Sequence, residues 1–503
     1  MAIFCTILSW AAVFLLFLVF VTFLGYCVYV KYIHMKYDHI PGPPRNSFLL
    51  GHSSTFLEIM RNGGVVHDKF LEWAEIHGPV YRLNVLHYIL LLVTCPETTK
   101  EVLMSAKYPK DSFYKKLFNL FGQRFLGNGL VTALDHEQWY KQRRVIDPAF
   151  SSLYLRGLMG TFNERAEKLM TKLTDVADNK TEASMLKLVN FVTIDVIAKV
   201  AFGVDLDQLE NPSVFPKAIE MCLKAMVFVA RDVLFEYNPK NRPFIKKVRE
   251  ASHLLRSTGA KWVHNRRTAM QNGEDVPKDI LTQIMKTAGK EENTTKEDEE
   301  LMLDNFVTFF IAGQETTANQ LAFCIMELTR HPEILEKLRK ELDDVIGMKQ
   351  DISYDDLGKL IYLSQVLKET LRIYPPAPGT TRDVPYDFVI DGIRVPAGAT
   401  YFFNSYVCGR MEKFFKDPLT FDPDRFHPDA PKPYYCYYPF ALGPRSCLGQ
   451  TFAQMEAKVV MAKLLQRFDF SLVPGQTFDV EDTGTLRPKS GVVCSVRHRN
   501  HKK

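Results

Sequence analysis

An unbroken run of apolar residues opens the chain. Residues 2–30 contain no charged side chain, and the first positive charges, Lys31 and Lys36, follow the run. About 20 helical residues rising ~1.5 Å each cross a ~30 Å hydrocarbon core, so the run is long enough to span a membrane. A cleaved signal peptide would carry its positive charge before a shorter apolar core. The pattern therefore predicts a retained anchor, residues 1–30, with the rest of the chain on the cytosolic side.

A basic and proline-rich segment follows the anchor. It covers residues 31–45 and contains four prolines or glycines between Ile40 and Arg45. Proline fixes the backbone and ends helices. We therefore expect a stiff hinge between the anchor and the body.

Helical periodicity dominates the body. A helix that is apolar nearly all round is predicted from about Glu299 to Arg330, and such a helix should be buried. No Gly/Ser- or Pro-rich linker divides residues 46–503, so we expect one large domain, mainly α with small β-sheets. The other predicted elements are helices over 65–77, through 97–270 and over 450–467, and strands over 80–93 and 388–390.

Composition excludes some classes of function. A net charge of +5 on a mixed surface is not typical of a nucleic-acid-binding protein. The nine cysteines are scattered without C-x-x-C pairs. This argues against a disulfide framework and against a zinc site, and it fits a reducing compartment.

One loop near the C-terminus combines a cysteine with glycines and an arginine. Phe440 opens the loop, Gly443 and Gly449 flank Cys447, and Arg445 precedes the cysteine by two residues. The glycines should let the backbone turn tightly and approach a flat, bulky group, and the arginine can meet a carboxylate. Because a helix is predicted to begin just after the cysteine, its N–H groups should favour the thiolate. Such a thiolate suits an axial ligand of haem iron; a buried cysteine in an ordinary turn is the alternative.

Polar residues interrupt the long apolar helix at its centre, in the run Ala-Gly-Gln-Glu-Thr-Thr over residues 312–317. Gly313 costs helix stability, and the Thr316 hydroxyl can bond the carbonyl of Ala312 and bend the helix. A break of this kind in a buried helix is expected where a site has been built. A capping or packing threonine is the alternative.

Two further pairs lie at helical spacing. Trp139 and Arg143 are four residues apart, so an indole N–H and a guanidinium can reach one anion. Glu369 and Arg372 are three residues apart and can form an ion pair. If buried, this ion pair would be needed for folding, whereas an exposed one would contribute little.

The pattern Phe-x-x-Gly-x-Arg-x-Cys-x-Gly resembles the haem-binding loop of the cytochrome P-450 family, and the other motifs follow in that family's order. The resemblance covers essentially the whole chain after the anchor. It implies the cytochrome P-450 fold, a single large triangular domain, with haem b as cofactor and Cys447 as the axial ligand of its iron. Glu315 and Thr316 match the acid–alcohol pair that relays protons during catalysis. The residues that match those at the haem propionates are Trp139, Arg143, Arg382 and Arg445. The cofactor-binding loop includes Phe440, Gly443 and Gly449. A structural trio is matched by Glu369, Arg372 and Arg425.

Longer runs, residues 40–52, 305–323 and 452–468, resemble the cholesterol 24-hydroxylase branch of that family. This implies a monooxygenase that hydroxylates a sterol side chain in a closed apolar pocket. Gln314 and Pro378 stand where that branch has histidine and tryptophan, which leaves a fatty acid, a retinoid or another steroid open as substrate. The candidate pocket residues, for which plain core packing is the alternative, are Phe118, Phe121, Ala312, Ala377 and Thr485.

The resemblance also implies partners and a location. No flavin or nicotinamide fingerprint occurs in the chain, so electrons should come from an NADPH-cytochrome reductase. The other expected partners are O2, a lipid or sterol substrate and a membrane crossed once; no nucleic acid is expected. The implied location is the endoplasmic reticulum membrane. A reductase-independent haem-thiolate isomerase or peroxygenase tends to lack the acid–alcohol pair, and a non-catalytic haem carrier or sensor would not need it.

Overall fold

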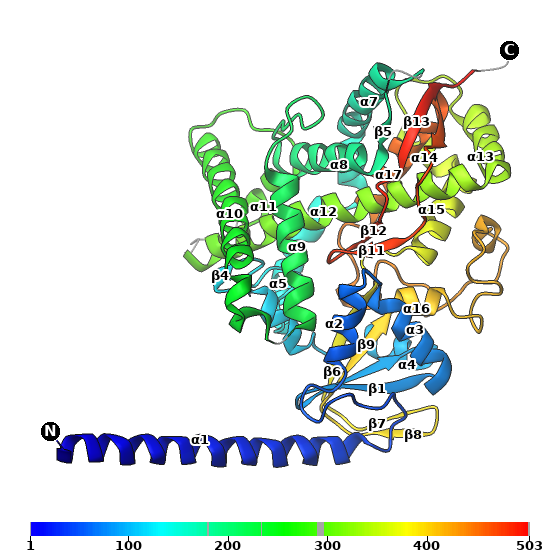
Figure 1. The fold of residues 1–503 in the computed structure, drawn as a ribbon. Coiled ribbons are helices and arrows are strands. Elements are labelled where there is room, and N and C mark those ends of the chain that lie inside the picture. The colour runs from blue at the N-terminus through cyan, green and yellow to red at the C-terminus, as the bar shows by residue number, and fades with distance from the viewer. Residues whose placement is uncertain (1, 179–180, 233, 289–295, 501–503) are drawn as a thin grey trace.

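The computed structural model describes residues 2–178, 181–232, 234–288 and 296–500. Met1 and residues 501–503, the outer ends of the predicted anchor and body, lie outside the described residues. Figure 1 shows a long N-terminal helix that projects from the body, with a small sheet near this helix and most other helices farther away.

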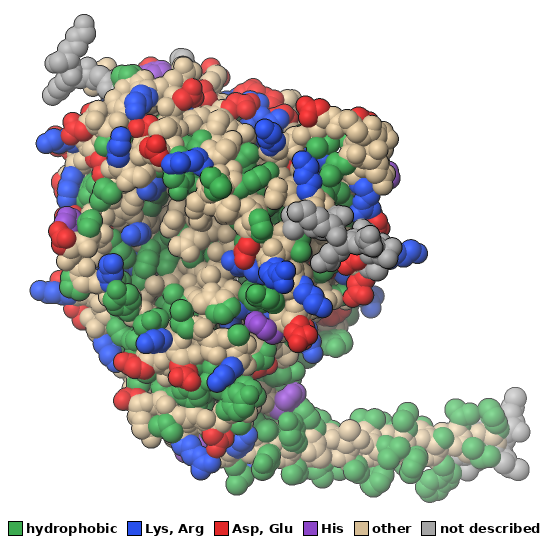
Figure 2. Space-filling view, turned by 180° about the vertical axis from the view of Figure 1, so that it is seen from behind, with side chains coloured by type: hydrophobic (Ala, Val, Ile, Leu, Met, Phe, Trp, Pro, Cys, Tyr) green, Lys and Arg blue, Asp and Glu red, His purple; other side chains and the backbone are tan. Residues whose placement is uncertain are grey.

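The projecting helix is α1 (Ala2–Tyr37), and it continues beyond the predicted end of the anchor at residue 30. Its last turns pack on the body: Val30 and Tyr37 are buried, and Lys36 Nζ donates to the Ala397 carbonyl at 2.7 Å. The predicted hinge of residues 31–45 therefore begins inside a docked helix, and only its proline-rich end is irregular. Residues 7–37 are long and apolar enough to cross a membrane, and Figure 2 shows hydrophobic side chains along the projecting helix.

A four-stranded sheet lies at the α1 end of the body, with strand order β1-β2-β9-β6. β1 and β2 form an antiparallel hairpin, β2 pairs with β9 in parallel, and β9 pairs with β6 antiparallel. The predicted helix over 65–77 and strands over 80–93 are confirmed. The strands are β1 (Val80–Val85), β2 (Tyr88–Val93), β6 (Gly379–Val384) and β9 (Ala399–Asn404), and the helices around them are α2 (Ser53–Arg61), α3 (Val66–His77), α4 (Pro96–Leu103) and α16 (Ser405–Gly409).

The rest of the body is mainly helical, as predicted. The α-helices are α5 (His136–Ile146), α6 (Ser152–Arg156), α7 (Met159–Val176), α8 (Met185–Phe202), α9 (Phe215–Arg231), α10 (Arg242–Gln271), α11 (Ile280–Ala288), α12 (Lys296–Arg330), α13 (Pro332–Val345), α14 (Tyr354–Lys359), α15 (Ile361–Ile373) and α17 (Gln450–Arg467). The 3-10 helices are η1 (Ser112–Leu117), η2 (Asp147–Phe150), η3 (Phe235–Tyr237), η4 (Pro239–Asn241), η5 (Pro423–Phe426) and η6 (Gly443–Arg445).

Helix α12 crosses the middle of the body (Figure 1). The prediction of a long buried helix is confirmed, with a start three residues earlier, at Lys296 rather than Glu299. Most of its residues from Asp304 to Leu328 are buried, and its apolar side chains belong to the largest core cluster, together with those of α8 and α17. Close packing on several sides makes α12 a rigid support for any side chain it carries.

Short strands complete the fold. They form a three-stranded sheet, β10-β13-β5, and three two-stranded ribbons. The predicted strand at 388–390 is β7, whereas β3, β4 and β5, of two residues each, lie within the range predicted as helical and are too short to produce a period-2 pattern. Their bounds are β3 (Asn119–Leu120), β4 (Gln123–Arg124), β5 (Ala183–Ser184), β7 (Phe388–Ile390), β8 (Ile393–Val395), β10 (Phe468–Leu472), β11 (Val480–Asp482), β12 (Leu486–Pro488) and β13 (Val493–His498).

Candidate active site

The loop that carries Cys447 is fixed by its own backbone and by the end of α4. The Cys447 N–H donates to the Phe440 carbonyl at 2.8 Å, which closes the loop. Gly443 has a φ of +68°, and a Cβ there would lie 2.1 Å from the Leu103 carbonyl oxygen. Only glycine fits this position. The lack of a side chain at Gly443 thus allows the loop to pack closely against the end of α4.

Cys447 lies just before α17, as predicted, but its thiol is not favoured as thiolate by the protein alone. Burial raises the pKa of the thiol and outweighs the opposing effects of the Gly449 N–H and the Arg143 charge. The helix end does favour the thiolate, as predicted, but desolvation is the larger effect and reverses the net result. Cys447 is nevertheless an exposed residue by its accessible surface.

Arginines from three parts of the chain meet near the cysteine. The Arg445 guanidinium carbon lies 4.1 Å from the centre of the Trp139 ring, and Arg143 Nη1 donates to the Ser446 carbonyl at 2.9 Å. Burial, followed by the charge of Arg382 in β6, lowers the pKa of Arg445 to about 10. The fold thus brings together the four residues that the resemblance assigns to the propionates.

Lys110 adds a further cation for which the sequence contains no motif. Its Nζ donates to the Val131 carbonyl at 2.8 Å and lies 4.3 Å from the centre of the Tyr114 ring. Burial lowers the pKa of Lys110, and the charges of Arg382 and Arg445 lower it further. Lys110 therefore lies in the same cationic cluster.

This cluster fits an anionic group such as the two propionates of haem. Arg382 is 1% exposed, and its Nη2 has no hydrogen-bond partner in the described structure. Nearby Asp111 is already engaged, since its Oδ1 accepts from the Thr381 hydroxyl at 2.6 Å. Buried cations that repel one another and keep a free donor are stabilised by an anion between them.

The centre of α12 opens on one face. Ala312 is exposed although the residues around it on the helix are mostly buried. The Thr316 hydroxyl donates to the Ala312 carbonyl at 2.7 Å, the bond expected from the sequence, so both residues share this face. Gly313 lies on another side of the helix, against α8, where a Cβ would lie 2.7 Å from the Ile197 side chain and the two would clash. The helix therefore presents a small side chain and a hydroxyl to open space.

Glu315, beside Thr316 in sequence, has different surroundings. It is buried, and its Oε1 accepts from the Thr485 hydroxyl at 3.2 Å and from Asn319 Nδ2 at 3.5 Å. Its Oε2 accepts from Gln314 Nε2 at 3.4 Å. Burial raises the pKa of the Glu315 carboxyl, with the hydrogen bonds from Thr485 and Asn319 opposing it. A carboxyl with a raised pKa beside a hydroxyl is suited to proton exchange.

Glu369, Arg372 and Arg425 lie together away from these groups. Arg372 binds the Glu369 carboxylate through Nε and Nη2, both at 2.7 Å, and both side chains are fully buried. Arg425 Nε lies 3.4 Å from Glu369 Oε1. Arg372 Nη1 also donates to the carbonyls of Gly409 and Pro418, so the ion pair ties α15 to the segment after α16.

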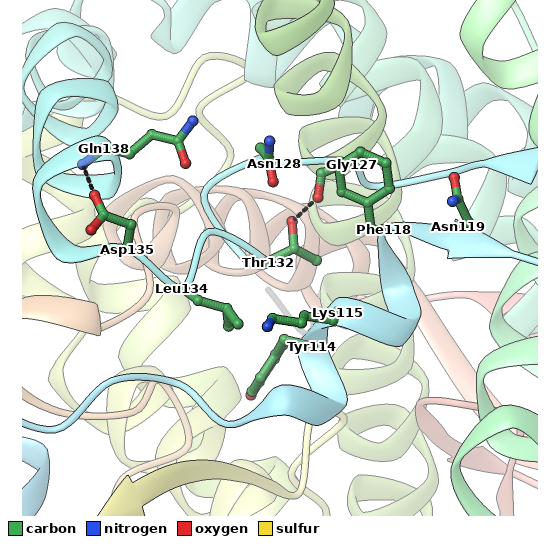
Figure 3. Close-up of a pocket in the computed structure, with 10 residues that line it drawn as sticks. All are labelled: Tyr114, Lys115, Phe118, Asn119, Gly127, Asn128, Thr132, Leu134, Asp135 and Gln138. Atoms are coloured by element: carbon green, nitrogen blue, oxygen red, sulfur yellow. Dashed lines mark hydrogen bonds between the residues drawn. The ribbon is translucent and has the colours of Figure 1, made fainter. Parts of the chain in front are cut away.

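The five candidate pocket residues have different surroundings. Phe118 lines a cavity of about 380 Å³ that the segment from Tyr114 to Gln138 surrounds (Figure 3). Many of its lining side chains are polar, unlike those expected for a sterol pocket. Phe121 is buried and stacks on Phe235, with ring centres 5.8 Å apart.

Of the other candidates, Ala312 and Ala377 are exposed and Thr485 is buried. The Leu486 N–H donates to the Pro376 carbonyl at 2.9 Å, which places the segments of Ala377 and Thr485 side by side. The Thr485 hydroxyl, however, is directed to Glu315. Asn319, which bonds both, is a residue that sequence reasoning missed; its spacing of four from Glu315 was the available signal.

Comparison with known proteins agrees with this geometry. The family model "Cytochrome P450" matches residues 41–495. Cytochrome P450 4d2 of Drosophila melanogaster is 28% identical over 415 residues, 78% of this chain and 81% of the relative. Cytochrome P450 3A6 of Oryctolagus cuniculus is 27% identical, covering 92% of each chain, and cytochrome P450 3A7 of Homo sapiens is 29% identical, covering 86% of this chain and 85% of the relative.

Proposed function

Because the chain belongs to the cytochrome P450 family, whose members are haem-dependent monooxygenases, we propose that it is a membrane-anchored monooxygenase that hydroxylates a sterol side chain. The proposal follows the cholesterol 24-hydroxylase branch that its longer sequence runs resemble. The observation that carries it is the open face of α12, where exposed Ala312 and the Thr316 hydroxyl interrupt an otherwise buried helix.

We assign the haem-holding role to Cys447 and the surrounding cations. Cys447 would ligate the haem iron through its sulfur, and Arg143, Arg382, Arg445 and Lys110 would neutralise the propionates, with Trp139 supporting Arg445. When bound, the haem would supply oxygen activation, which a thiolate ligand favours.

The protein's own contribution to the chemistry is proton delivery and exclusion of bulk water. Glu315 holds a proton in a buried position, and the Thr316 hydroxyl presents one on the open face of α12. Their adjacency in the helix lets the acid recharge the alcohol. These two residues are the ones we propose as catalytic.

The proposed substrate is a sterol that enters with its flexible side chain first. The small Ala312 leaves room over the reacting centre, whereas a bulky residue there would block the approach. Helix α1 is long and apolar enough to cross a membrane, and an anchored body would lie beside the bilayer in which such a lipid is dissolved. We propose the endoplasmic reticulum membrane as the location, with the domain of residues 46–503 on the cytosolic side and residues 1–30 as anchor.

Enzymes of this family take electrons from NADPH-cytochrome P450 reductase and use O2. On α5, Lys141 and Arg144 are exposed, whereas Trp139 is buried on the other side of the helix. We assign the two exposed cations to a docking face for the acidic surface of such a donor.

The test is turnover of the full chain with reductase and NADPH on a panel of sterols, fatty acids and retinoids, with products identified by mass spectrometry. Cholesterol should shift the spin state of the iron and give a side-chain alcohol. Ring hydroxylation or a preference for a fatty acid contradicts the sterol assignment. If no lipid in the panel causes NADPH consumption, the monooxygenase role is contradicted and a carrier or sensor is indicated. Turnover that needs no reductase indicates an isomerase or peroxygenase.

A further inference from the structure

The carboxyl of Glu315 is bonded from a part of the chain remote from α12. The Thr485 hydroxyl donates to Glu315 Oε1 at 3.2 Å across 170 positions of sequence. Asn319 Nδ2 lies 3.0 Å from the Thr485 hydroxyl oxygen and 3.5 Å from the same carboxylate oxygen. Hydroxyl, carboxamide and carboxylate therefore form a closed triangle in which all three residues are buried.

The turn that carries Thr485 is fixed on its outer side. Gly484, with φ of +97°, approaches α9 so closely that a Cβ would lie 2.6 Å from the Leu223 carbonyl oxygen. The ribbon of β11 and β12 is also tied to α9 by two ion pairs, Asp482 with Arg231 and Arg487 with Glu220. The position of Thr485 is thus set by packing rather than by Glu315.

From this geometry we infer that Thr485 and Asn319 are positioning residues that hold the Glu315 carboxylate for proton transfer, and that Thr485 is not a contact of the substrate. The inference rests on the proposed role of Glu315. It replaces the expectation from sequence that Thr485 lines the substrate pocket. Thr485 is only 7% exposed and its hydroxyl already donates to the Glu315 carboxylate, so little of its side chain remains open to a ligand.

Loss of the Thr485 hydroxyl should change the pKa of Glu315 in a predictable direction. Donors to a carboxylate favour its ionised form, so their removal raises its pKa, which burial has already raised. The charged groups that face Glu315 are Arg487 of β12, which opposes this rise, and Glu220 of α9, which adds to it. Because the proposed role needs Glu315 as the proton donor, this role is lost as pH rises through the Glu315 pKa, and the loss should begin at a higher pH in the variant.

The experiment compares Thr485→Val, Thr485→Ser and Thr483→Val in the haem-loaded full chain. Thr483 is a matched control, because it is equally buried in the same ribbon but bonds only the Thr485 backbone. The readout is the ratio of product formed to NADPH consumed as a function of pH. In Thr485→Val the alkaline limb, where the ratio falls because Glu315 loses its proton, should move up by about one pH unit, whereas Thr485→Ser and Thr483→Val should follow the wild type.

Glu315→Gln separates this inference from the proposed function. If Glu315→Gln abolishes the alkaline limb and Thr485→Val shifts it, both stand. If Glu315→Gln changes nothing, the relay role of Glu315 itself fails. Two outcomes overturn the inference while Glu315→Gln acts as expected. If Thr485→Val raises only the KM for the sterol, Thr485 contacts the substrate. If Thr485→Ser behaves like Thr485→Val, the side chain merely fills space.

Discussion

The guanidinium of Arg445 lies over the indole of Trp139, with its central carbon 4.1 Å from the ring centre. A cation–π contact of this kind fixes a buried arginine without neutralising it. The same contact leaves Arg445 charged beside Arg382 and Lys110. The cluster is therefore a preformed anion site whose internal repulsion has consequences that can be measured.

Lys110→Met should have opposite effects on the two forms of the protein. Without haem the change removes a repelling buried charge, so the thermal midpoint should rise. With haem it removes a partner of a propionate, so haem should transfer to a scavenger protein several-fold faster. Lys110→Arg keeps the charge and should retain haem like the wild type. Equal midpoint changes in both forms would contradict the placement of Lys110 at the propionates.

Cys447→Ser should abolish the absorbance band typical of thiolate-ligated iron on binding of carbon monoxide. The reason is that serine supplies no thiolate to the axial position. Cys436→Ser is a suitable control, because this cysteine lies on the approach to the loop but is buried in the core cluster that includes the four-stranded sheet. A normal band in Cys447→Ser disproves the ligand assignment.

Thr316→Ala should keep haem and sterol binding but release reducing equivalents as peroxide. Positioned proton transfer is typically worth ~10²–10⁴ in rate, so product per NADPH should fall strongly. Thr308→Ala is the matched control: its hydroxyl donates to the Asp304 carbonyl at 2.8 Å, the same bond two turns earlier on α12. An equal loss in both variants would show that helix geometry, not the proton relay, is responsible.

The sequence predicts a structural feature correctly where one short segment determines both the local structure and the chemical groups. The helix after Cys447 and the bond from Thr316 to Ala312 are of this kind, since spacing along a helix determines them. The contact between Thr485 and Glu315 and the place of Lys110 depend on how distant segments pack, which no local pattern encodes. The sequence likewise does not show that burial raises the pKa of Cys447 more than the helix end lowers it, because the helix end is a local feature whereas burial is set by the whole fold.

Arg372→Met should destabilise the body by about 3–5 kcal/mol, because it leaves the buried Glu369 carboxylate with an uncompensated charge. The exposed pair Arg394 and Asp387, 2.8 Å apart, gives a matched control, and Arg394→Met should cost less than about 1 kcal/mol. Chemical unfolding of the haem-loaded proteins measures both. Similar values for the two variants would contradict a folding role for the buried pair.

The N-terminal part of α1 can be deleted without loss of the fold only if the end of α1 that packs on the body is kept. Tyr26 forms a hydrogen bond with His87 at 3.0 Å, and Val30 is fully buried, so deletion of residues 2–24 should leave a haem-loaded body whereas deletion through residue 37 should not.

The shortened protein should still bind anionic vesicles weakly. Leu234 and Tyr237 are 58% and 80% exposed, and they lie beside Lys240 and Arg242, where α9 and α10 meet on the α1 side of the body (Figure 1). Vesicle sedimentation of the shortened chain measures this binding, and the double change Leu234→Ser and Tyr237→Ser should abolish it. If the shortened chain stays in solution, or if the double variant still sediments, the contact with the membrane is made by α1 or by another surface.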